Sequence, residues 1–321
     1  MGTSFSFETF NALIRQANCA REDSYLNAPL YYALTGRKGL TIHEGYGAVL
    51  AVCHHPHIEN RLLVFPEVGN AGGKLTVSVL ESLEAPANGV QLARYSTEDL
   101  ASLSAAFAER NGSRVDCVKI VPEESLDWRY PVHILGTARV AALKGSDFAK
   151  IRNKVRKVES GIEVLSLQDP RALRAMRAAQ KYWEGSMVMR EKDGDDLEGF
   201  YSALFNRIGA QPQYFNGLVF MQGSRPVGFT VYDTPFMGTA NMLANLSDAS
   251  IAGLADFQVV ATCRAMSAAG IALMNFGGSE TESLDQYKRK FMPCKSLDLH
   301  SAEVGYALRE DVNVRSGVLV P

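Results

Sequence analysis

The second half of the sequence alternates helical and extended patterns in an order that few folds accommodate. Apolar residues recur every three or four positions from Leu197 to Ile208 and predict an amphipathic helix. Two apolar segments flank Gly223-Ser224 and predict a β-hairpin. Helices are also expected over residues 169–183 and 255–269, and strands near 240–245 and 271–276. This order of helix, helix, hairpin, strand, helix and strand belongs to the α/β class with a mixed sheet.

The first half shows a similar order of elements without similarity in its letters. Ser96 and Asp99 form a capping box that predicts the start of a helix, and Asn111-Gly112 predicts its end. The other expected elements are a helix over residues 7–19 and strands over 40–43, 47–53, 61–65 and 114–121. Because 321 residues exceed what one core usually fills, we expect two domains, residues 1–140 and 141–321, joined near 131–144.

Composition and charge exclude several classes of protein. Hydrophobic residues make up 46% and charged residues 21%, which is typical of a globular protein, and the net charge of −2 gives no general attraction to nucleic acid or membranes. The sequence shows neither a membrane span nor a secretory signal. Five cysteines without a CxxC pair indicate reduced thiols, so a cytoplasmic location is expected. His54, His55 and His57 lack acidic or cysteine neighbours, and no metal site is expected.

A basic segment opens the second half. Phe148, Ile151, Val155 and Val158 are spaced to form one buried face of a helix. Six basic residues and a single acid lie between Lys144 and Lys157, enough positive charge to hold phosphates. The alternative is an ordinary solvated helix face.

A second candidate segment covers residues 275–293. A predicted strand ends in Gly277-Gly278, where the lack of side chains lets backbone N–H groups approach a ligand. The basic cluster Lys288-Arg289-Lys290 follows, and then Phe291. The alternative is a glycine turn before an ordinary surface helix.

Several short matches between residues 128 and 293 carry a family resemblance. They are Tyr130-Pro131, Leu143-Lys144-Gly145, Arg152-Asn153, Glu159-Ser160-Gly161, Pro226-Val227-Gly228-Phe229, Asn245-Leu246-Ser247, Asn275-Phe276-Gly277-Gly278-Ser279 and Tyr287-Lys288-Arg289-Lys290-Phe291. In this order and spacing they resemble the C-terminal catalytic domain of phosphatidylglycerol lysyltransferases and, more distantly, the Fem-type peptidyltransferases. Roughly half of the chain is covered.

The resemblance implies a fold and a reaction. Both families belong to the GNAT superfamily, so it implies two GNAT-like domains in tandem, each with a mixed, mostly antiparallel sheet flanked by helices. It also implies transfer of an aminoacyl group from aminoacyl-tRNA to an amine or hydroxyl, without a cofactor, in the C-terminal domain. The Q/R-x-x-G-x-G/A motif that binds acyl-CoA is missing from residues 247–257. No membrane part or coiled-coil arm is found in the sequence, so a small-molecule or peptide acceptor is expected.

Two other functions stay open. One is an N-acyltransferase that uses acyl-CoA or an acyl carrier protein. The other is a GNAT-derived module that binds a ligand without catalysis.

The resemblance also implies site residues. Lys288 matches the lysine proposed to stabilise the oxyanion. Asp233, Asp248 and Glu280 are expected near strand ends or loops, where a carboxylate can take a proton or bind the donor's α-ammonium group, and the sequence does not choose among them. The residues expected to bind the donor are Lys150, Arg152, Asn153, Lys154, Arg156, Asn275, Gly277, Gly278, Ser279 and Lys290.

Overall fold

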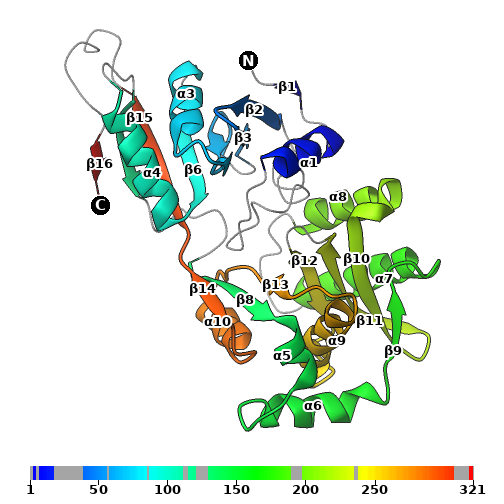
Figure 1. Cartoon of the computed structure of the whole chain (residues 1–321). Helices are drawn as coiled ribbons and strands as arrows, with labels where there is room; N and C mark the ends of the chain where they lie inside the picture. Colours follow the sequence, from blue (N-terminus) through cyan, green and yellow to red (C-terminus); the bar gives the residue numbers. More distant parts are fainter. Residues whose placement is uncertain are drawn as a thin grey trace. The chain divides into compact units, whose positions relative to one another are not determined.

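A computed structural model describes residues 3–4, 7–17, 39–55, 58–84, 87–110, 115–120, 129–188, 197–234, 238–306 and 318–320 (Figure 1). The chain divides into two compact units. The first contains Met1–Val132, Gly278–Asp285 and Ser296–Pro321, and the second contains His133–Gly277 and Gln286–Lys295.

The first unit is built on a sheet with nine described strands in the order β1-β2-β3-β4-β6-β15-β7-β16, with β5 paired to β3. The strands are β1 (Thr3–Ser4), β2 (Thr41–Gly45), β3 (Ala48–His54), β4 (Leu62–Val64), β5 (Val68–Gly69), β6 (Val90–Tyr95), β7 (Val115–Ile120), β15 (His300–Tyr306) and β16 (Val318–Val320). Neighbours pair antiparallel except β4 with β6 and β16 with β7.

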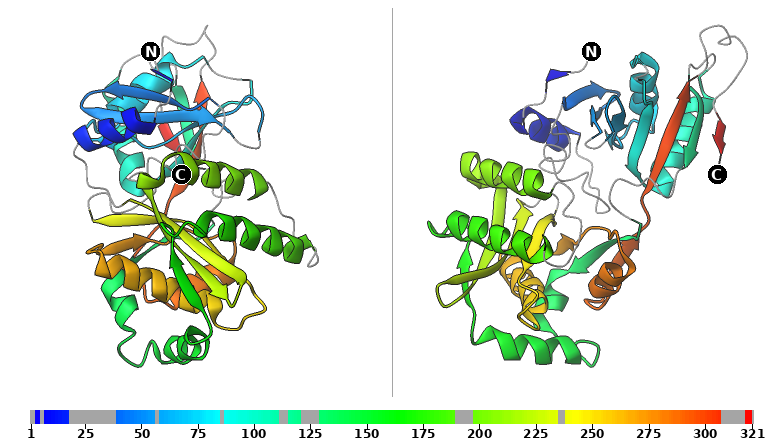
Figure 2. Two further views of the ribbon diagram at one scale, coloured as in Figure 1. Left: turned by 90° about the vertical axis from the view of Figure 1, so that its right-hand side faces the viewer. Right: turned by 180° about the vertical axis from the view of Figure 1, so that it is seen from behind.

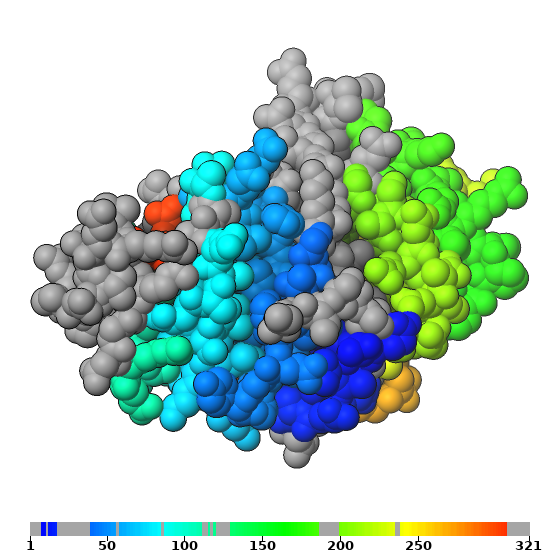
Figure 3. All heavy atoms as spheres, turned by 90° about the horizontal axis from the view of Figure 1, so that it is seen from above, coloured from blue at the N-terminus to red at the C-terminus, as the bar shows by residue number. Residues whose placement is uncertain are grey.

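Three described helices accompany this sheet, α1 (Phe7–Gln16), α3 (Lys74–Ser82) and α4 (Thr97–Ala108). Helix α1 lies at the surface in Figure 3, in dark blue, and buries Phe10 and Ile14. The predicted capping box starts α4: Ser96 Oγ accepts from the Asp99 N–H at 3.1 Å, and Asp99 Oδ2 accepts from the Ser96 N–H at 2.9 Å.

The second unit contains a seven-stranded sheet in the order β14-β8-β13-β12-β11-β10-β9. The strands are β8 (Val132–Gly136), β9 (Glu163–Ser166), β10 (Phe215–Gln222), β11 (Arg225–Asp233), β12 (Thr239–Ser247), β13 (Leu273–Asn275) and β14 (Lys295–Leu297). The helices are α5 (Thr137–Ala142), α6 (Ala149–Glu159), α7 (Ala172–Val188), α8 (Leu197–Ala210), α9 (Leu254–Ala268) and α10 (Glu282–Arg289), with a 3-10 turn at Pro212–Tyr214. The division of the chain passes through α10 and β14, so that Glu282–Asp285 and residues 296–297 are counted with the first unit. β12 and β13 pair parallel, whereas β8 pairs antiparallel with β13, and β9 to β12 form antiparallel neighbours.

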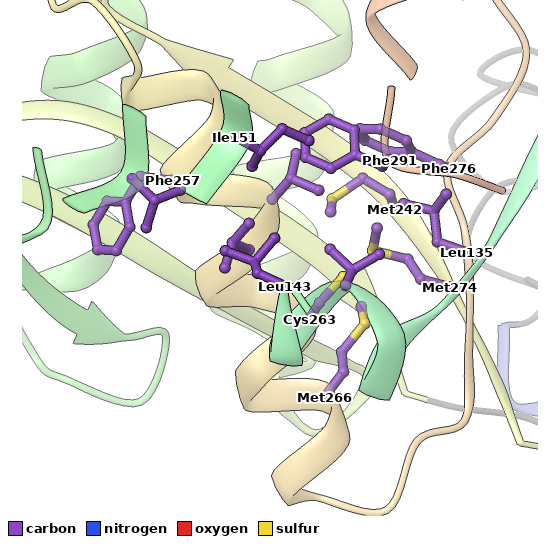
Figure 4. Packing of buried hydrophobic residues seen from close by; sticks show 14 of the residues in the cluster. Leu135, Leu143, Ile151, Met242, Phe257, Cys263, Met266, Met274, Phe276 and Phe291 are labelled. Carbon is purple, nitrogen blue, oxygen red and sulfur yellow. The ribbon is translucent and has the colours of Figure 1, made fainter. Parts of the chain in front are cut away.

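Helices cover both faces of this second sheet (Figure 2). On one face, α5, α6 and α9 enclose a core that includes Met242, Met274 and Phe276 (Figure 4). On the other face, Phe229 of β11 contacts two aromatic rings of α8, Phe205 and Tyr201, at centroid distances of 5.7 and 5.9 Å. Helix α7 lies against β10, β11 and β12.

The predicted fold class is confirmed: each unit combines a mixed, mostly antiparallel sheet with flanking helices. The hairpin at Gly223-Ser224 is present, and the helices expected over 197–208 and 255–269 are α8 and α9. Of the expected elements of the first half, residues 18–19, 111–112, 114 and 121 lie outside the described residues.

The observed division differs from the expected domains 1–140 and 141–321. The first junction lies between Val132 and His133, and residues 296–321 belong to the first unit. The reason is β15, which inserts between β6 and β7 and pairs with both, Ala302 being opposite Leu92 and Ile120. Such a pairing joins distant parts of the chain and leaves no trace in local sequence patterns.

Candidate functional site

The expected glycine turn follows β13 and is fixed by its own side chains. Gly277 has a φ of 72°, a left-handed conformation that glycine adopts without a steric penalty. Its N–H donates to Asn275 Oδ1 at 2.9 Å. Its carbonyl oxygen accepts from Lys288 Nζ of α10 at 3.3 Å. The turn therefore connects an amide side chain on β13 to an ammonium group on α10.

Lys288 is unusual for a lysine because it is only 8% exposed. Its Nζ lies 5.4 Å from the centroid of the Phe276 ring. A ring face and a carbonyl oxygen both carry partial negative charge, so they offset part of the cost of taking the ammonium group out of water. The structure thus places a partly desolvated positive charge at the end of β13.

A buried carboxylate lies on the same sheet. Asp233 ends β11, where it is 3% exposed. Its Oδ1 accepts from the backbone N–H of Asn241 at 2.6 Å, and its Oδ2 accepts from Asn241 Nδ2 at 2.8 Å. Asn241 on β12 is in turn the register partner of Asn275 on β13. We call Asp233, Asn241 and Asn275 the polar ladder, because they follow one another across three adjacent strands.

The polar ladder lies on the face of the sheet opposite α9. Tyr232, Met242 and Met274 belong to the core against α9, and neighbouring residues of a strand point to opposite faces. A β-bulge helps to set this arrangement: Val231 pairs with Ala244 but Tyr232 pairs with Met242. The extra residue, Leu243, shifts the pattern of β12 two positions after Asn241.

Burial controls the protonation of Asp233. Loss of solvent raises the pKa of its carboxyl group to about 7, although the two hydrogen bonds from Asn241 act in the opposite direction. A carboxyl group with a pKa near neutrality can both accept and release a proton under physiological conditions. Asp233 can therefore change its protonation state near neutral pH.

Asp248, by contrast, is used structurally. Its Oδ1 accepts from the N–H and hydroxyl of Ser250, and its Oδ2 accepts from Arg225 Nη1 at 2.9 Å. Burial would raise its pKa, but these hydrogen bonds and the Arg225 charge outweigh burial, and the pKa is lowered. Asp248 stays an ionised cap of the turn after β12.

The basic segment forms α6, and its charged residues divide into two groups. Arg152 Nη1 donates to the carbonyl oxygens of Leu143 and Gly145, at 2.5 and 3.1 Å, and so closes the end of α5. Lys150, Asn153 and Arg156 are exposed along the helix. The exposed group is available to a ligand, whereas the guanidinium of Arg152 is engaged by the protein itself.

A charge cluster around one buried carboxylate joins α6, α9 and the residue after α10. Asp256, in the first turn of α9, is 3% exposed. It forms ion pairs with Lys154, at 3.4 Å, and with Lys290. Lys290 Nζ also lies 3.9 Å from the centroid of the Tyr287 ring. We call Lys154, Asp256 and Lys290 the Asp256 cluster; it binds two of the predicted donor-binding lysines to a carboxylate.

The remaining predicted residues fall in the first unit. Gly278, Ser279 and Glu280 belong there by the division of the chain. Ser279 is buried, and its carbonyl oxygen accepts from the N–H groups of Arg129 and Tyr130 at 2.9 and 3.1 Å. Glu280 is exposed. The structure therefore assembles Asp233, Asn275, Gly277 and Lys288 within one unit and leaves Glu280 outside that group.

Two residues of these clusters were not predicted from the sequence. Asn241 is a polar residue inside a largely apolar strand, and Asp256 is an isolated acid in the first turn of a helix. Each is a polar residue within an apolar pattern, and this is the sequence signal that marks it. The residues with which each one pairs are distant in the sequence, so the signal alone does not reveal its role.

The described residues contain neither a metal-binding cluster nor a membrane-spanning helix. Within the described ranges, no group of three or more His, Cys, Asp or Glu side chains is placed to hold a metal ion. His54 and His55 are described, whereas His57 lies outside the described residues. In the part of the chain that the structure describes, no helix combines the length and apolar character needed to cross a bilayer.

Comparisons with known proteins place the fold. No protein-family model matches the sequence, and no curated protein matches it. A conserved protein of unknown function from Bacteroides thetaiotaomicron VPI-5482 has a similar structure, with a TM-score of 0.72 and 14% identity, covering 95% of this chain and 99% of that one.

Two further solved structures are similar over most of this chain. The C-terminal domain (DUF2156) of a putative lysylphosphatidylglycerol synthetase from Agrobacterium fabrum has a TM-score of 0.61 and 14% identity, covering 93% of this chain and 92% of that one. L-PGS from Bacillus licheniformis has a TM-score of 0.64 and 15% identity, covering 94% and 93%. The resemblance inferred from the sequence is thus confirmed at the level of the fold.

The Asp256 cluster leads to a prediction about stability. Lys290→Met leaves the buried carboxylate with Lys154 alone, and we expect the free energy of unfolding to fall by about 1–3 kcal/mol, the cost of an unsatisfied buried acceptor. Lys150→Met, which changes an exposed lysine of α6, should stay within about 0.5 kcal/mol of wild type. Urea unfolding followed by circular dichroism measures both, and equal stability of the two variants would contradict the described ion pair.

The environment of Asp233 predicts a dependence of stability on pH. Its pKa is about 7 in the folded protein and near the ordinary 3.8 in the unfolded chain. Protonated Asp233 therefore stabilises the fold fully below pH 3.8, and this contribution disappears as the pH rises through about 7. Asp233→Asn should flatten the decline of the free energy of unfolding between pH 4 and pH 8, measured by urea unfolding at each pH.

Asp248→Asn is the control, and its effect on the pH profile should have the opposite sign. The lowered pKa of Asp248 stabilises the fold at high pH, and this contribution disappears as the pH falls. Parallel profiles for the two variants would refute the assignment.

Proposed function

We propose that this chain is an aminoacyltransferase that moves an aminoacyl group from aminoacyl-tRNA to an amine or hydroxyl of a small-molecule or peptide acceptor. The observation that carries the proposal is the connection of a buried ammonium group, Lys288, to the polar ladder through the Gly277 turn. It lies in a fold shared with the C-terminal domain of a putative lysylphosphatidylglycerol synthetase. Charged tRNA is found in the cytoplasm, and we expect the reaction to take place there.

The proposed reaction needs two kinds of group, and the second unit contains both. The acceptor nitrogen or oxygen forms a bond to the ester carbonyl carbon, and negative charge develops on the carbonyl oxygen. The ammonium of Lys288 would stabilise that oxyanion. Asp233 would accept the proton that the acceptor loses, and the proton then returns to the tRNA hydroxyl as the ester C–O bond breaks. An ester is already activated, so no covalent enzyme intermediate is required.

The exposed face of α6 supports a polyanionic donor. Lys150 and Arg156 present positive charge to solvent on one helix, while Arg152 and Lys154 are engaged with the protein. Phosphates neutralised by such residues release counterions, which gives affinity without sequence specificity. We assign phosphate binding to Lys150 and Arg156 and a structural role to Arg152 and Lys154.

The start of α9 supports tRNA over acyl-CoA as the donor. Helix starts bind pyrophosphate through free N–H groups and the positive end of the helix dipole. Here the N-cap Gly253 is approached by α6: a Cβ at this position would lie 3.2 Å from Lys154 Cβ and 3.3 Å from the Lys154 carbonyl oxygen. This close approach of α6 leaves little room for a pyrophosphate at the helix start.

A donor assay tests the proposal directly. With total tRNA charged with labelled amino acids and a cell extract, we expect a labelled small-molecule or peptide product that is lost after RNase treatment. Acyl-CoA and acyl carrier protein donors should give none. Binding of charged tRNA should weaken as salt rises. Lys150→Ala and Arg156→Ala should each lower the slope of log affinity against log salt concentration by about one phosphate contact.

Lys181→Ala removes an exposed lysine of α7 and is the matched control, expected to leave the slope unchanged. Transfer from acyl-CoA instead of tRNA would contradict the proposed donor. Stable binding of charged tRNA without any transfer would contradict the proposed catalysis.

The role of Lys288 can be measured separately from binding. Lys288→Met should lower single-turnover transfer by about two to three powers of ten, the loss typical of one oxyanion donor. Donor affinity should change by less than about threefold, because the interaction strengthens only in the transition state. Lys295→Met, an exposed lysine shortly after α10, should behave as wild type. Turnover of Lys288→Met within about threefold of wild type would rule out the oxyanion role.

A further inference from the structure

Three polar atoms, two in the polar ladder and one beside it, lack hydrogen-bond partners in the described part of the chain. They are Asn241 Oδ1, Asn275 Nδ2 and Thr239 Oγ1, and their residues are 1%, 0% and 2% exposed. A buried polar atom without a partner costs about 1–3 kcal/mol, so native proteins rarely keep one without a reason. Here three of them occur on two adjacent strands.

The chemical identity of the two free amide atoms follows from their occupied partners. Asn241 directs its NH₂ group to Asp233 Oδ2, at 2.8 Å. Its oxygen is therefore the free atom. Asn275 must direct its oxygen to the Gly277 N–H, since a backbone N–H only donates. Its NH₂ group is therefore free. Together the two asparagines present one unpaired acceptor, Asn241 Oδ1, and one unpaired donor group, Asn275 Nδ2.

The strand register places this acceptor and donor group side by side. Asn241 and Asn275 are register partners in the parallel pair β12–β13, whose strands lie about 4.8 Å apart. Thr239 lies two residues before Asn241 and shares its face of the sheet. A ligand that satisfies both asparagines needs a donor and an acceptor within a few ångströms of each other.

An α-aminoacyl group has this arrangement. Its ammonium group and its carbonyl oxygen are attached to neighbouring carbon atoms, so the ammonium can donate to Asn241 Oδ1 while the carbonyl accepts from Asn275 Nδ2. The ammonium would also lie close to the Asp233 carboxylate that Asn241 holds. A simple acyl group has only the carbonyl, and it would leave the Asn241 oxygen buried and unpaired.

We propose that Asn241 and Asn275 recognise the free α-amino group and the carbonyl of an aminoacyl group, so that the site selects aminoacyl donors over simple acyl and N-blocked ones. The inference rests on the proposed function, since it concerns the donor of that same site. It adds the residues that determine selectivity and the chemical feature they recognise. A site built to hydrogen-bond a group rejects analogues that lack it, by about two powers of ten or more.

Binding of small probes to the full chain tests the recognition without any transfer reaction. We expect L-alaninamide to bind and to shift the side-chain amide signal of Asn275 in ¹H–¹⁵N spectra, that signal being assigned by its loss in Asn275→Ser. N-acetyl-L-alaninamide and propionamide should bind at least about 100-fold more weakly and leave the signal in place.

Variants separate recognition from stability. Asn241→Ala should weaken L-alaninamide binding at least about tenfold, the effect of one lost hydrogen bond to a charged group. Thr239→Val keeps the side-chain volume and serves as a second variant if Asn241→Ala unfolds; it should weaken binding severalfold. Asn206→Ala, at an exposed asparagine of α8, is the matched control and should bind as wild type. Circular dichroism confirms that each variant is folded.

The outcomes distinguish this inference from the proposed function. If L-alaninamide and its N-acetyl form bind equally, or if neither shifts the Asn275 signal, the inference is overturned. If charged tRNA and N-acetylated charged tRNA serve equally as donors, the transferase stands and the recognition fails. If L-alaninamide binds selectively but no donor supports transfer, the recognition stands and the transferase fails.

Discussion

The parallel pairing of β12 with β13 is the constraint on which the candidate site depends. Two parallel strands cannot be joined by a tight turn, so the chain crosses over one face of the sheet through α9 before it returns as β13. That crossover buries Met242 and Met274 against the helix and directs Asn241 and Asn275 to the other face. It also ends β13 beside β12, where the Gly277 turn and Lys288 follow. A slip of one residue in this register would exchange the two faces and separate the polar ladder.

Lys288 and Lys290 are separated by a single residue in the sequence, but their environments differ. Lys288 contacts a backbone carbonyl and the face of Phe276, while Lys290 pairs with Asp256 at the start of α9. In Lys290, burial lowers the pKa and the Asp256 hydrogen bond acts against it. The Asp256 carboxylate therefore pairs with the charge of Lys290 and fixes the end of α10. Lys288 is then held in a defined position, unlike a lysine that moves freely at the surface. A charge held in place in this way is what a developing oxyanion requires.

Much of the second unit could be predicted from the sequence because its elements have strong local signals. The stripe from Leu197 to Ile208 and the glycine at 223 fix a helix and a hairpin through contacts between near neighbours. The site was predictable in part, since Asn275, Gly277 and Lys288 lie within fourteen residues of one another. Asn241 was not, because its role arises only when β12 lies beside β13. The pairing of Lys290 with Asp256 joins residues far apart in the chain, and the interaction of Arg152 with the α5 end depends on a loop conformation.

The place of β15 in the first sheet determines the order in which this protein can be completed during synthesis. β6 and β7 are made early, but the strand that pairs with both of them consists of residues 300–306. Until those residues leave the ribosome, each of these two strands has an edge without its final neighbour, while every residue of the second unit has already been made. The second unit is thus inserted between segments of the first unit, and it can fold while the first unit is still incomplete. Unpaired strand edges tend to pair with other strands, so the first unit is open to incorrect strand pairing until β15 has been made.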